Sequence, residues 1–216
     1  MMDRMLDAAE AVVVRQGISS LTLEAVAAQA GVSKGGLLHY FPSKDRLVEG
    51  MVIRCAEQWR AHAMEAFDQA APGPGRMARA LLSHLVDKEE WTDNCAQSSS
   101  AAFAALMQNP RLIAPMRAVY DELRAKLADD GLPPGAGETI LVAMDGLWLN
   151  RVLGLAPVDQ PRMDRIRHAL EQLLPPAAKP HRPGTNGALK KNSTTRKTQR
   201  TSPRKAPRKA SRKATR

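Results

Sequence analysis

One stretch, residues 22–47, constrains the fold of this chain more than any other: TLEAVAAQAGVSKGGLLHYFPSKDRL. Thr22 is a good helix N-cap, and apolar residues come after it at helical spacing until Gly31, a residue type that commonly ends helices. Ser33 can cap a second, short helix, which the following proline ends, and Ser43 can cap a third. Two short helices joined by a tight glycine-containing turn are typical of a helix-turn-helix motif.

The second of these helices combines polar side chains with two glycines. Lys34, His39 and Tyr40 supply the polar groups. Gly35 and Gly36 each lower helix stability by roughly 1 kcal/mol, a cost that is intelligible if the backbone must approach another surface closely. The helix start also presents N–H groups and a positive dipole end, which suit a phosphate. This pattern favours a surface that contacts nucleic acid.

The sequence LTLEAVAAQAGVSKGGLLHYFPSKDRL, preceded by an amphipathic helix, resembles the DNA-binding head of the tetracycline-repressor (TetR) family of bacterial regulators. The resemblance covers about the first 50 residues and rests on a glycine turn followed by SKGxLxxYFxSKxxL. Leu38 stands where this family often has an aromatic residue. The resemblance implies a sequence-specific transcriptional regulator. More specifically, it implies a repressor that binds a palindromic double-stranded operator and is released by a small-molecule effector.

The matched motif also implies roles for individual residues. Lys34 and His39 would face the major groove, while Tyr40, Lys44 and Thr22 would bond phosphates; phosphate contacts position a protein on DNA and base-edge contacts specify the sequence. Tyr40 could instead pack in the core, as Phe41 is expected to, and Lys44 could be a solvated lysine at a helix start. The predicted DNA-binding residues are Thr22, Ser33, Lys34, Gly35, Gly36, His39, Tyr40 and Lys44.

Helical periodicity recurs along the rest of the chain, and no strand-like alternation is present, so we predict an all-α fold of about nine helices. Residues 1–46 form the predicted helix-turn-helix domain and residues 47–175 a helical ligand-binding and dimerisation domain. Because about 45 residues are too few for a stable core, the head should dock on this second domain. The expected helices outside the motif are Met2–Gln16, Ser43–Ala70, Arg76–Lys88, Trp91–Gln108, Arg111–Asp129, Glu138–Gly154 and Met163–Leu174.

The positive charge of the chain is concentrated at its end. The formal net charge is +10, but residues 177–216 hold 14 Lys and Arg and no acid, which leaves 18 basic against 22 acidic residues elsewhere. Residues 176–216 are rich in Pro, Ser, Thr, Lys and Arg, so we predict a disordered basic tail. It could anchor the protein on nucleic acid without sequence preference, or simply be a solvated extension.

Composition weighs against several other functions. No apolar run is long enough to cross a membrane, and no signal peptide is recognisable. Cys55 and Cys95 are far apart and lack metal-ligand spacing, which favours a cytosolic compartment and no metal site. The resemblance to TetR regulators implies a bacterial cytoplasmic protein associated with the nucleoid, and we expect no cofactor. The serines at 98–100 have no nearby base and no phosphate-binding loop is present, so we do not expect an enzyme.

Large or soft side chains on separate predicted helices could line an apolar cavity for a ligand, although each could equally be ordinary core. Asp145 is the most unusual polar group because it interrupts an apolar helix. It could pair with Arg151, pair with a dimer partner, or recognise a cationic ligand. The candidate ligand-binding residues are Trp59, His62, Phe67, Phe103, Met107, Met116, Tyr120, Met144, Asp145 and Trp148.

The resemblance further implies a homodimer in which the last two helices pair with those of a second subunit. The same apolar helices could simply complete the monomer core. An alternative to the regulator is an architectural, nucleoid-type DNA-binding protein dominated by its basic tail. A regulator would retain a large preference for its operator over random DNA, whereas a compacting protein would not.

Overall fold

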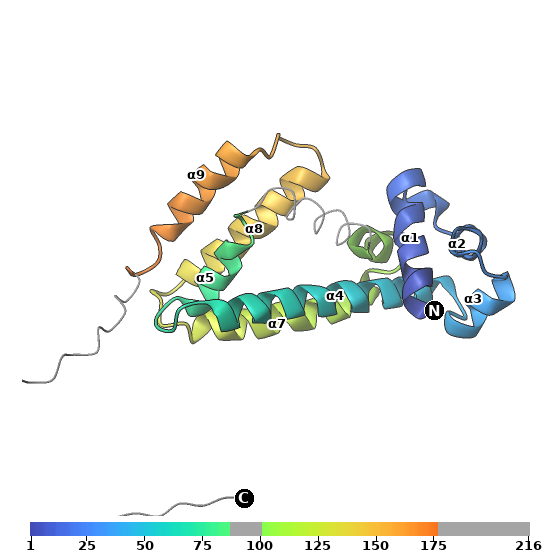
Figure 1. The fold of residues 1–216 in the computed structure, drawn as a ribbon, viewed down its shortest axis with the longest axis horizontal. Helices are drawn as coiled ribbons and strands as arrows, with labels where there is room; N and C mark the ends of the chain where they lie inside the picture. Colours follow the sequence, from blue (N-terminus) through green and yellow to red (C-terminus); the bar gives the residue numbers. More distant parts are fainter. Residues whose placement is uncertain (87–100, 177–216) are drawn as a thin grey trace, which may run out of the picture. The chain divides into compact units, whose positions relative to one another are not determined.

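The structure, a computed structural model, describes residues 1–86 and 101–176, and every regular element in these ranges is helical (Figure 1). The all-α prediction is therefore confirmed, and the predicted tail beyond residue 176 lies outside the described residues. The elements are α1 (Met2–Gln16), η1 (Ile18–Ser20), α2 (Leu23–Ala30), α3 (Lys34–Tyr40), α4 (Lys44–Gln69), α5 (Arg76–Ser83), η2 (Pro110–Ile113), α7 (Ala114–Ala128), α8 (Ala136–Val152) and α9 (Gln160–Glu171). Residues 101–108 are also helical.

The helices of the head begin at the residues that the sequence marks as caps. Thr22 Oγ1 accepts a hydrogen bond from the Ala25 N–H at 3.1 Å, and Ser33 Oγ accepts one from the Gly36 N–H at 3.0 Å. Ser43 Oγ accepts from the Arg46 N–H at 3.2 Å. Each bond satisfies an N–H group that a helix start leaves without a partner.

Gly31 makes the turn between α2 and α3. It is left-handed (φ 64°, ψ 37°), its N–H donates to the Ala28 carbonyl, and the Val32 N–H donates to the Ala27 carbonyl. This pair of bonds is the Schellman motif, which glycine favours because it has no Cβ to clash in the left-handed region. The turn fixes the angle at which α3 leaves α2.

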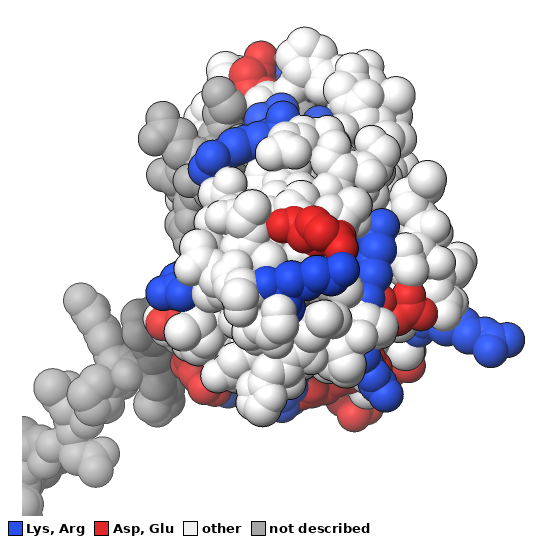
Figure 2. Space-filling model, turned by 90° about the vertical axis from the view of Figure 1, so that its right-hand side faces the viewer, with Lys and Arg blue, Asp and Glu red and all other residues white. Residues whose placement is uncertain are grey.

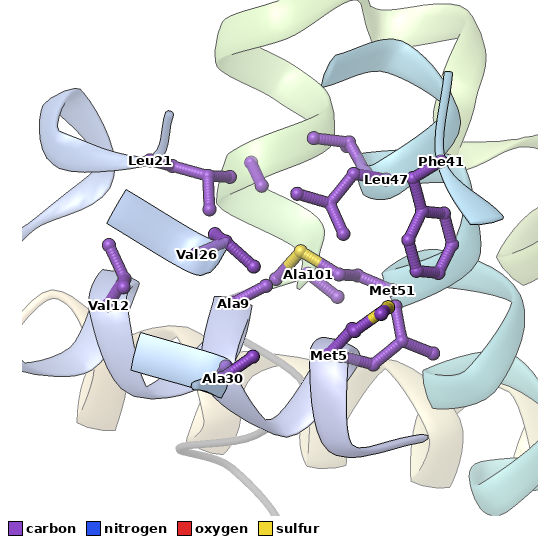
Figure 3. Packing of buried hydrophobic residues seen from close by; sticks show 14 of the residues in the cluster. Met5, Ala9, Val12, Leu21, Val26, Ala30, Phe41, Leu47, Met51 and Ala101 are labelled. Atoms are coloured by element: carbon purple, nitrogen blue, oxygen red, sulfur yellow. The ribbon is translucent and has the colours of Figure 1, made fainter. Parts of the chain in front are cut away.

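The core of the head contains residues from far along the chain. Met5, Leu21, Leu37 and Met51 are buried together, and the helical residues at 101–108 add Ala101, Ala104 and Ala105 to the same cluster. Figure 3 shows Ala101 among the side chains of the head. The expected docking of the head on the second domain is confirmed, and small alanines let this distant helix approach closely.

Polar contacts join α4 to the head and to the later helix. The Arg54 guanidinium donates to Asp7 Oδ1 at 2.6 Å and lies 2.7 Å from Glu10 Oε1, which ties α4 to α1. The Gln108 amide donates to Asp45 Oδ1 at 2.6 Å, close to the start of α4. Helix α4 is thus fixed in its N-terminal half by both the head and residues 101–108.

A second hydrophobic core lies between α4, α5, α7, α8 and α9, and its most deeply buried members include Met77, Leu81, Leu123, Ile140 and Met163. Helix α5 depends on a residue outside its own sequence. Asp130, which is buried, accepts hydrogen bonds at 2.9 Å from the N–H groups of both Met77 and Ala78. Its carboxylate therefore caps the N-terminus of α5, where the helix dipole also favours an anion.

Several helix bounds differ from the predicted ones. Helix α5 ends at Ser83 instead of Lys88, and α7 begins at Ala114 because η2 precedes it and Pro115 occupies its first turn. Helix α8 begins at Ala136, two residues early, and α9 begins at Gln160 because the Asp159 side chain accepts from the Arg162 N–H at 2.8 Å. Residues 91–100 of the predicted helix Trp91–Gln108 lie outside the described residues.

Candidate DNA-binding surface and effector site

The face of α3 that points away from the head core carries the polar residues predicted to bind DNA. Leu37 is fully buried, whereas Ser33, Lys34, Gly35 and His39 are exposed. A methyl group added at Gly36 would meet Ser33 Oγ at 3.3 Å, so glycine leaves room for the capping hydroxyl. The short helix therefore buries one side and offers the other to a partner.

The structure separates the two aromatic residues that end α3. Phe41 is buried in the head core, as expected. Tyr40 is 44% exposed and its ring meets the His39 ring edge-on, with centroids 5.2 Å apart. The sequence leaves open whether Tyr40 packs in the core or contacts a phosphate. Its exposure disfavours core packing. Lys44 is partly exposed at the start of α4.

Lys34 has an acidic neighbour. Its Nζ lies 2.5 Å from Glu24 Oε1, an oxygen of a residue in the first turn of α2. The hydrogen bond from Lys34 is the main reason that the pKa of Glu24 lies below its usual value. Glu24 is not among the predicted DNA-binding residues, because a pairing between side chains of two helices has no signal at a fixed sequence spacing.

The surface at this end of the molecule is not uniformly basic. Figure 2, which views the structure from the right-hand side of Figure 1, shows Lys and Arg side chains interspersed with acidic ones. A protein that bound DNA only through charge would present a more continuous basic surface. The mixed charge favours DNA contacts made by individual side chains over attraction to a continuous basic surface.

Four of the predicted ligand-binding residues form two contacts that are linked through helix α8. The Tyr120 hydroxyl on α7 donates to Asp145 Oδ1 on α8 at 2.5 Å. Asp145 and Trp148 are three residues apart on α8 and so share a face of the helix. The Trp148 ring in turn stacks on the Phe103 ring, with centroids 6.5 Å apart and an interplanar angle of 21°. We call Phe103, Tyr120, Asp145 and Trp148 the Asp145 cluster.

The acid of this cluster is in an unusual electrostatic state. Burial raises the pKa of Asp145 above its usual value, although the hydrogen bond from Tyr120 and the charge of Arg124 oppose the shift. Burial is also the main cause that raises the pKa of the Tyr120 phenol, with the Asp145 charge adding to it. The hydrogen-bond partner of Asp145 is therefore this phenol and not Arg151.

The other candidate ligand residues are placed differently. Met144 is buried, and Met116 touches both hydrophobic cores. His62 and Met107 are exposed, Met107 to 73%, so neither lies in the interior where an apolar cavity would need it. Polar or flexible residues at helical spacing cannot be assigned to a buried face by pattern alone.

Phe67 and Trp59 pack against the same core as Tyr120 and Trp148, but their ring contacts are with other residues. The Phe67 ring lies beneath the Arg76 guanidinium at 4.2 Å and beside Lys126 Nζ at 5.3 Å, in a groove whose cations are attracted to its face. The Trp59 ring contacts the His84 ring, with centroids 5.3 Å apart, and the Trp59 Nε1 donor is buried without an acceptor among the described residues. Neither residue belongs to the Asp145 cluster.

The Asp145 cluster is connected to the head by two short routes. Phe103 belongs to the same helical segment as Ala101, Ala104 and Ala105, which are part of the head core. Tyr120 lies one helical turn after Met116, and Met116 packs against both cores. The long helix α4 also joins the head to the helical domain, so residues 101–116 provide a second connection, which was not predicted from the sequence.

The remaining chemistry of the described residues is limited. No group of three His, Cys, Asp or Glu side chains there is arranged to hold a metal ion. Burial raises the pKa of the Cys55 thiol to about 12, so this thiol is not a nucleophile at neutral pH. None of the helices in the described ranges has the length and apolar character needed to cross a bilayer.

A capped helix-turn-helix that packs on a helical domain with an internal polar cluster defines a class of protein: a DNA-binding regulator with a ligand-responsive domain. Comparison with known proteins agrees. Residues 5–51 match the model of bacterial regulatory proteins of the tetR family, and residues 75–175 match the tetracyclin repressor-like C-terminal domain. The chain belongs to the TetR family of transcriptional regulators.

Individual relatives are similar over most of the chain. The HTH-type transcriptional regulator BetI of Escherichia coli K12 is 25% identical over 181 residues, which cover 80% of this chain and 93% of the relative. A solved TetR family member from Streptomyces coelicolor A3 is 28% identical, with a TM-score of 0.57 over 80% of this chain and 97% of that one. The multidrug binding protein EbrR, complexed with malachite green, is 27% identical, with a TM-score of 0.60 over 81% of this chain and 98% of that one.

Proposed function

We propose that this regulator binds a palindromic operator as a homodimer and leaves it when a cationic, aromatic small molecule binds at the Asp145 cluster. The observation that carries the effector proposal is the Tyr120–Asp145 hydrogen bond, which holds a partly buried carboxylate three residues along α8 from Trp148, whose ring stacks on Phe103. We place this activity in the bacterial cytoplasm, on the nucleoid.

The DNA contacts are proposed to come from the exposed face of the helix-turn-helix. Lys34 and His39 reach base edges, Gly35 and Gly36 allow close approach, and Tyr40 contributes a phosphate contact. Thr22, Ser33 and Lys44 complete the contact set at the phosphates. The exposed positions of Lys34, His39 and Tyr40 support this assignment, because the same helix buries Leu37 on its opposite side.

The first experiment measures operator affinity with and without the lysine. An operator is first selected from a pool of random duplexes with the full chain. Lys34→Ala is expected to weaken operator binding by about 1–3 kcal/mol. Lys126→Ala, a change of equal charge on α7, serves as the control and is expected to leave affinity unaltered. Unchanged operator affinity in Lys34→Ala would remove Lys34 from the contact set.

The homodimer proposal rests on helix α8, which is apolar on two sides. Ile140, Leu141 and Met144 are buried in the core, while Val142, Leu149 and Leu153 remain exposed on another side. Exposed apolar side chains that share one helix face are typical of an interaction surface. Leu149→Glu is expected to yield a monomer in analytical ultracentrifugation and to lose operator binding, whereas a dimer retained in Leu149→Glu would place the interface elsewhere.

The cluster indicates the chemical class of the effector. A cation can pair with a partly buried carboxylate and also stack on aromatic faces, and a low local dielectric constant strengthens both attractions. EbrR, a structural relative, has been solved with ethidium and with malachite green. These relatives motivate the choice of probes, and the Asp145 cluster supplies the residues that would hold such a molecule here.

The effector experiment measures binding of ethidium and malachite green to the full chain by isothermal titration calorimetry. Asp145→Asn keeps the side-chain shape but removes the charge, and is expected to weaken binding of both dyes at least tenfold. Asp121→Asn, an exposed position on α7, is the matched control. Dye binding that is equal in Asp145→Asn and the parent would exclude Asp145 as the counter-ion.

Ligand and DNA binding should be coupled. A molecule that favours one arrangement of the two heads lowers DNA affinity, and DNA lowers affinity for that molecule by the same factor. The contacts of Phe103 and Met116 with elements that also enter the head core support a route for this coupling. If a dye binds tightly but operator affinity is the same with and without it, release by an effector of this class is excluded.

The basic tail is proposed to anchor the protein on DNA without sequence preference. Its 14 cations would displace counter-ions from DNA and make binding strongly dependent on salt. Removing residues 177–216 is expected to weaken binding to random duplex and to flatten the salt dependence, while the preference for the operator persists. A salt dependence that deletion leaves unaltered would identify the tail as a solvated extension.

A further inference from the structure

A cation at the first position of α3 is electrostatically unfavourable for the helix. The positive end of the helix dipole lies there, and α3 has no acidic residue in its first turn to offset it. The nearest compensation is Glu24, whose carboxylate lies 2.5 Å from Lys34 Nζ and belongs to α2. The arrangement of Lys34 is therefore set by a residue of the neighbouring helix.

The ion pair is of little use for folding. The Lys34 and Glu24 side chains are 56% and 63% exposed, and an ion pair so exposed to water contributes little to stability. Both residues nevertheless lie on the part of the head that carries the proposed DNA contacts, with Glu24 two residues beyond Thr22 and Lys34 next to Ser33. A negative charge on such a surface opposes the approach of phosphates.

We infer that Glu24 is a specificity-determining residue: it holds Lys34 in the free protein and releases it only to a DNA site that offers a better acceptor. The inference rests on the proposed contact between Lys34 and DNA. At a base edge, lysine meets directed acceptors, such as guanine O6 and N7, and the contact offsets the lost ion pair. On random DNA, Lys34 meets only phosphates, and Glu24 both competes for the lysine and repels them.

Two elements of the structure limit the other roles that Glu24 could have. An acid in the first turn favours α2 through the helix dipole, but Thr22 already caps that helix with its own hydroxyl. The dipole effect also requires no particular partner, whereas the Glu24 side chain is turned towards one lysine of a different helix. A residue that only stabilised α2 would affect DNA binding equally whether or not Lys34 was present.

The test is a double-mutant cycle on DNA binding. Glu24→Gln, Lys34→Ala and the double variant of the full chain are titrated with the selected operator and with a random duplex of equal length, at two salt concentrations. Glu24→Gln is expected to tighten binding to random duplex about tenfold and to the operator about threefold, so that the preference for the operator falls. In the Lys34→Ala background the same change is expected to alter either affinity less than twofold.

The outcomes separate this inference from the proposed function. If Lys34→Ala leaves operator affinity unchanged, the proposed DNA contact itself fails. If Lys34→Ala weakens operator binding but Glu24→Gln has equal effects in both backgrounds, the contact stands and the inference about Glu24 is overturned. Asp121→Asn, which removes an exposed acid of α7, controls for net charge and is expected to leave both affinities unaltered. Thermal unfolding of each variant checks that α2 remains folded.

Discussion

The head and the helical domain after it are organised by signals of different range. In the head, Thr22, Ser33 and Ser43 each cap their own helix through a bond to an N–H three residues away. In the helical domain, α5 is capped by Asp130, which is 52 and 53 residues from its two donors. Local chemistry therefore determines where the helices of the DNA-binding element begin, whereas a long-range contact stabilises the start of α5 in the domain that would receive the effector.

The strongest way to test this difference is to remove the long-range cap. Asp130→Ala leaves the N–H groups of Met77 and Ala78 buried without an acceptor, and it removes an anion from the positive end of α5. We expect a loss of about 2–4 kcal/mol in the free energy of unfolding, measured by urea denaturation of the full chain.

The neighbouring acid provides the control for this experiment. Asp129 is exposed, so Asp129→Ala should change the free energy of unfolding by less than about 0.5 kcal/mol. Equal losses in the two variants would show that charge near the end of α7, and not the cap on α5, stabilises the domain.

A second prediction concerns Gly50, at the point where α4 packs against the core of the head. A methyl group added at Gly50 of α4 would lie 2.9 Å from Phe41 Cε1 and 3.3 Å from Leu6 Cδ2, both buried in the head core. Overpacking should outweigh the better helix propensity of alanine, so Gly50→Ala is expected to destabilise the protein by about 1–2 kcal/mol. Thermal unfolding followed by circular dichroism measures the change.

Gly35 of α3 is the matched glycine, since its nearest neighbour outside the backbone is Ser33 Oγ at 4.0 Å. Gly35→Ala should therefore stabilise the folded protein by about 0.5–1 kcal/mol. If both alanine variants were stabilising, the contact of α4 with Phe41 would not be the constraint that fixes the head on α4.

A smaller effect is expected at the local caps. Ser43→Ala removes the acceptor for the Arg46 N–H at the start of α4, and should cost about 1 kcal/mol because water can replace part of an exposed cap. Ser19→Ala, at an exposed serine of η1, should cost less than about 0.5 kcal/mol. A loss at Ser43 as large as that at Asp130 would remove the distinction between local and long-range capping.

The same distinction explains what the sequence could predict. The bounds of α1 and the caps at Thr22, Ser33 and Ser43 were predictable, because each depends on residues only a few positions apart. The cap of Asp130 on α5 was not, since nothing in the sequence around Asp130 or Met77 reveals the other. The predicted start of α9 at Met163 was wrong although Asp159 is a local cap. Pro157 and Pro161 flank this cap, and prolines so placed also favour a turn.

The two candidate sites also differ in how far the sequence predicts them. The DNA-binding residues belong to one contiguous motif, so their exposure on α3 agrees with the interpretation of the sequence. The ligand residues were chosen by residue type on separate helices. The hydrogen bond and the ring contact that join them to one another are Tyr120–Asp145 and Phe103–Trp148. Which of several large side chains face one another depends on helix packing, and that information is distributed over the whole core.

The most subtle prediction tests the long-range pair of Tyr120 and Asp145 through pH. Because burial raises the pKa of Asp145, the folded state retains a proton that the unfolded state has lost, and stability falls as pH rises from the ordinary aspartate pKa of about 3.9 through the folded value. The Tyr120 hydrogen bond opposes this shift, so Tyr120→Phe should raise the pKa of Asp145 further. The variant should then lose more stability than the parent at neutral pH, and this pH-dependent part of the difference should vanish in acid below that ordinary value.

Carboxyl ¹³C NMR titration measures the pKa of Asp145, and urea unfolding across the same pH range measures the stability. Tyr40→Phe, at an exposed tyrosine in the head, is the control and should alter neither quantity. A pKa of Asp145 that fell in Tyr120→Phe would show that the phenol does not stabilise the carboxylate.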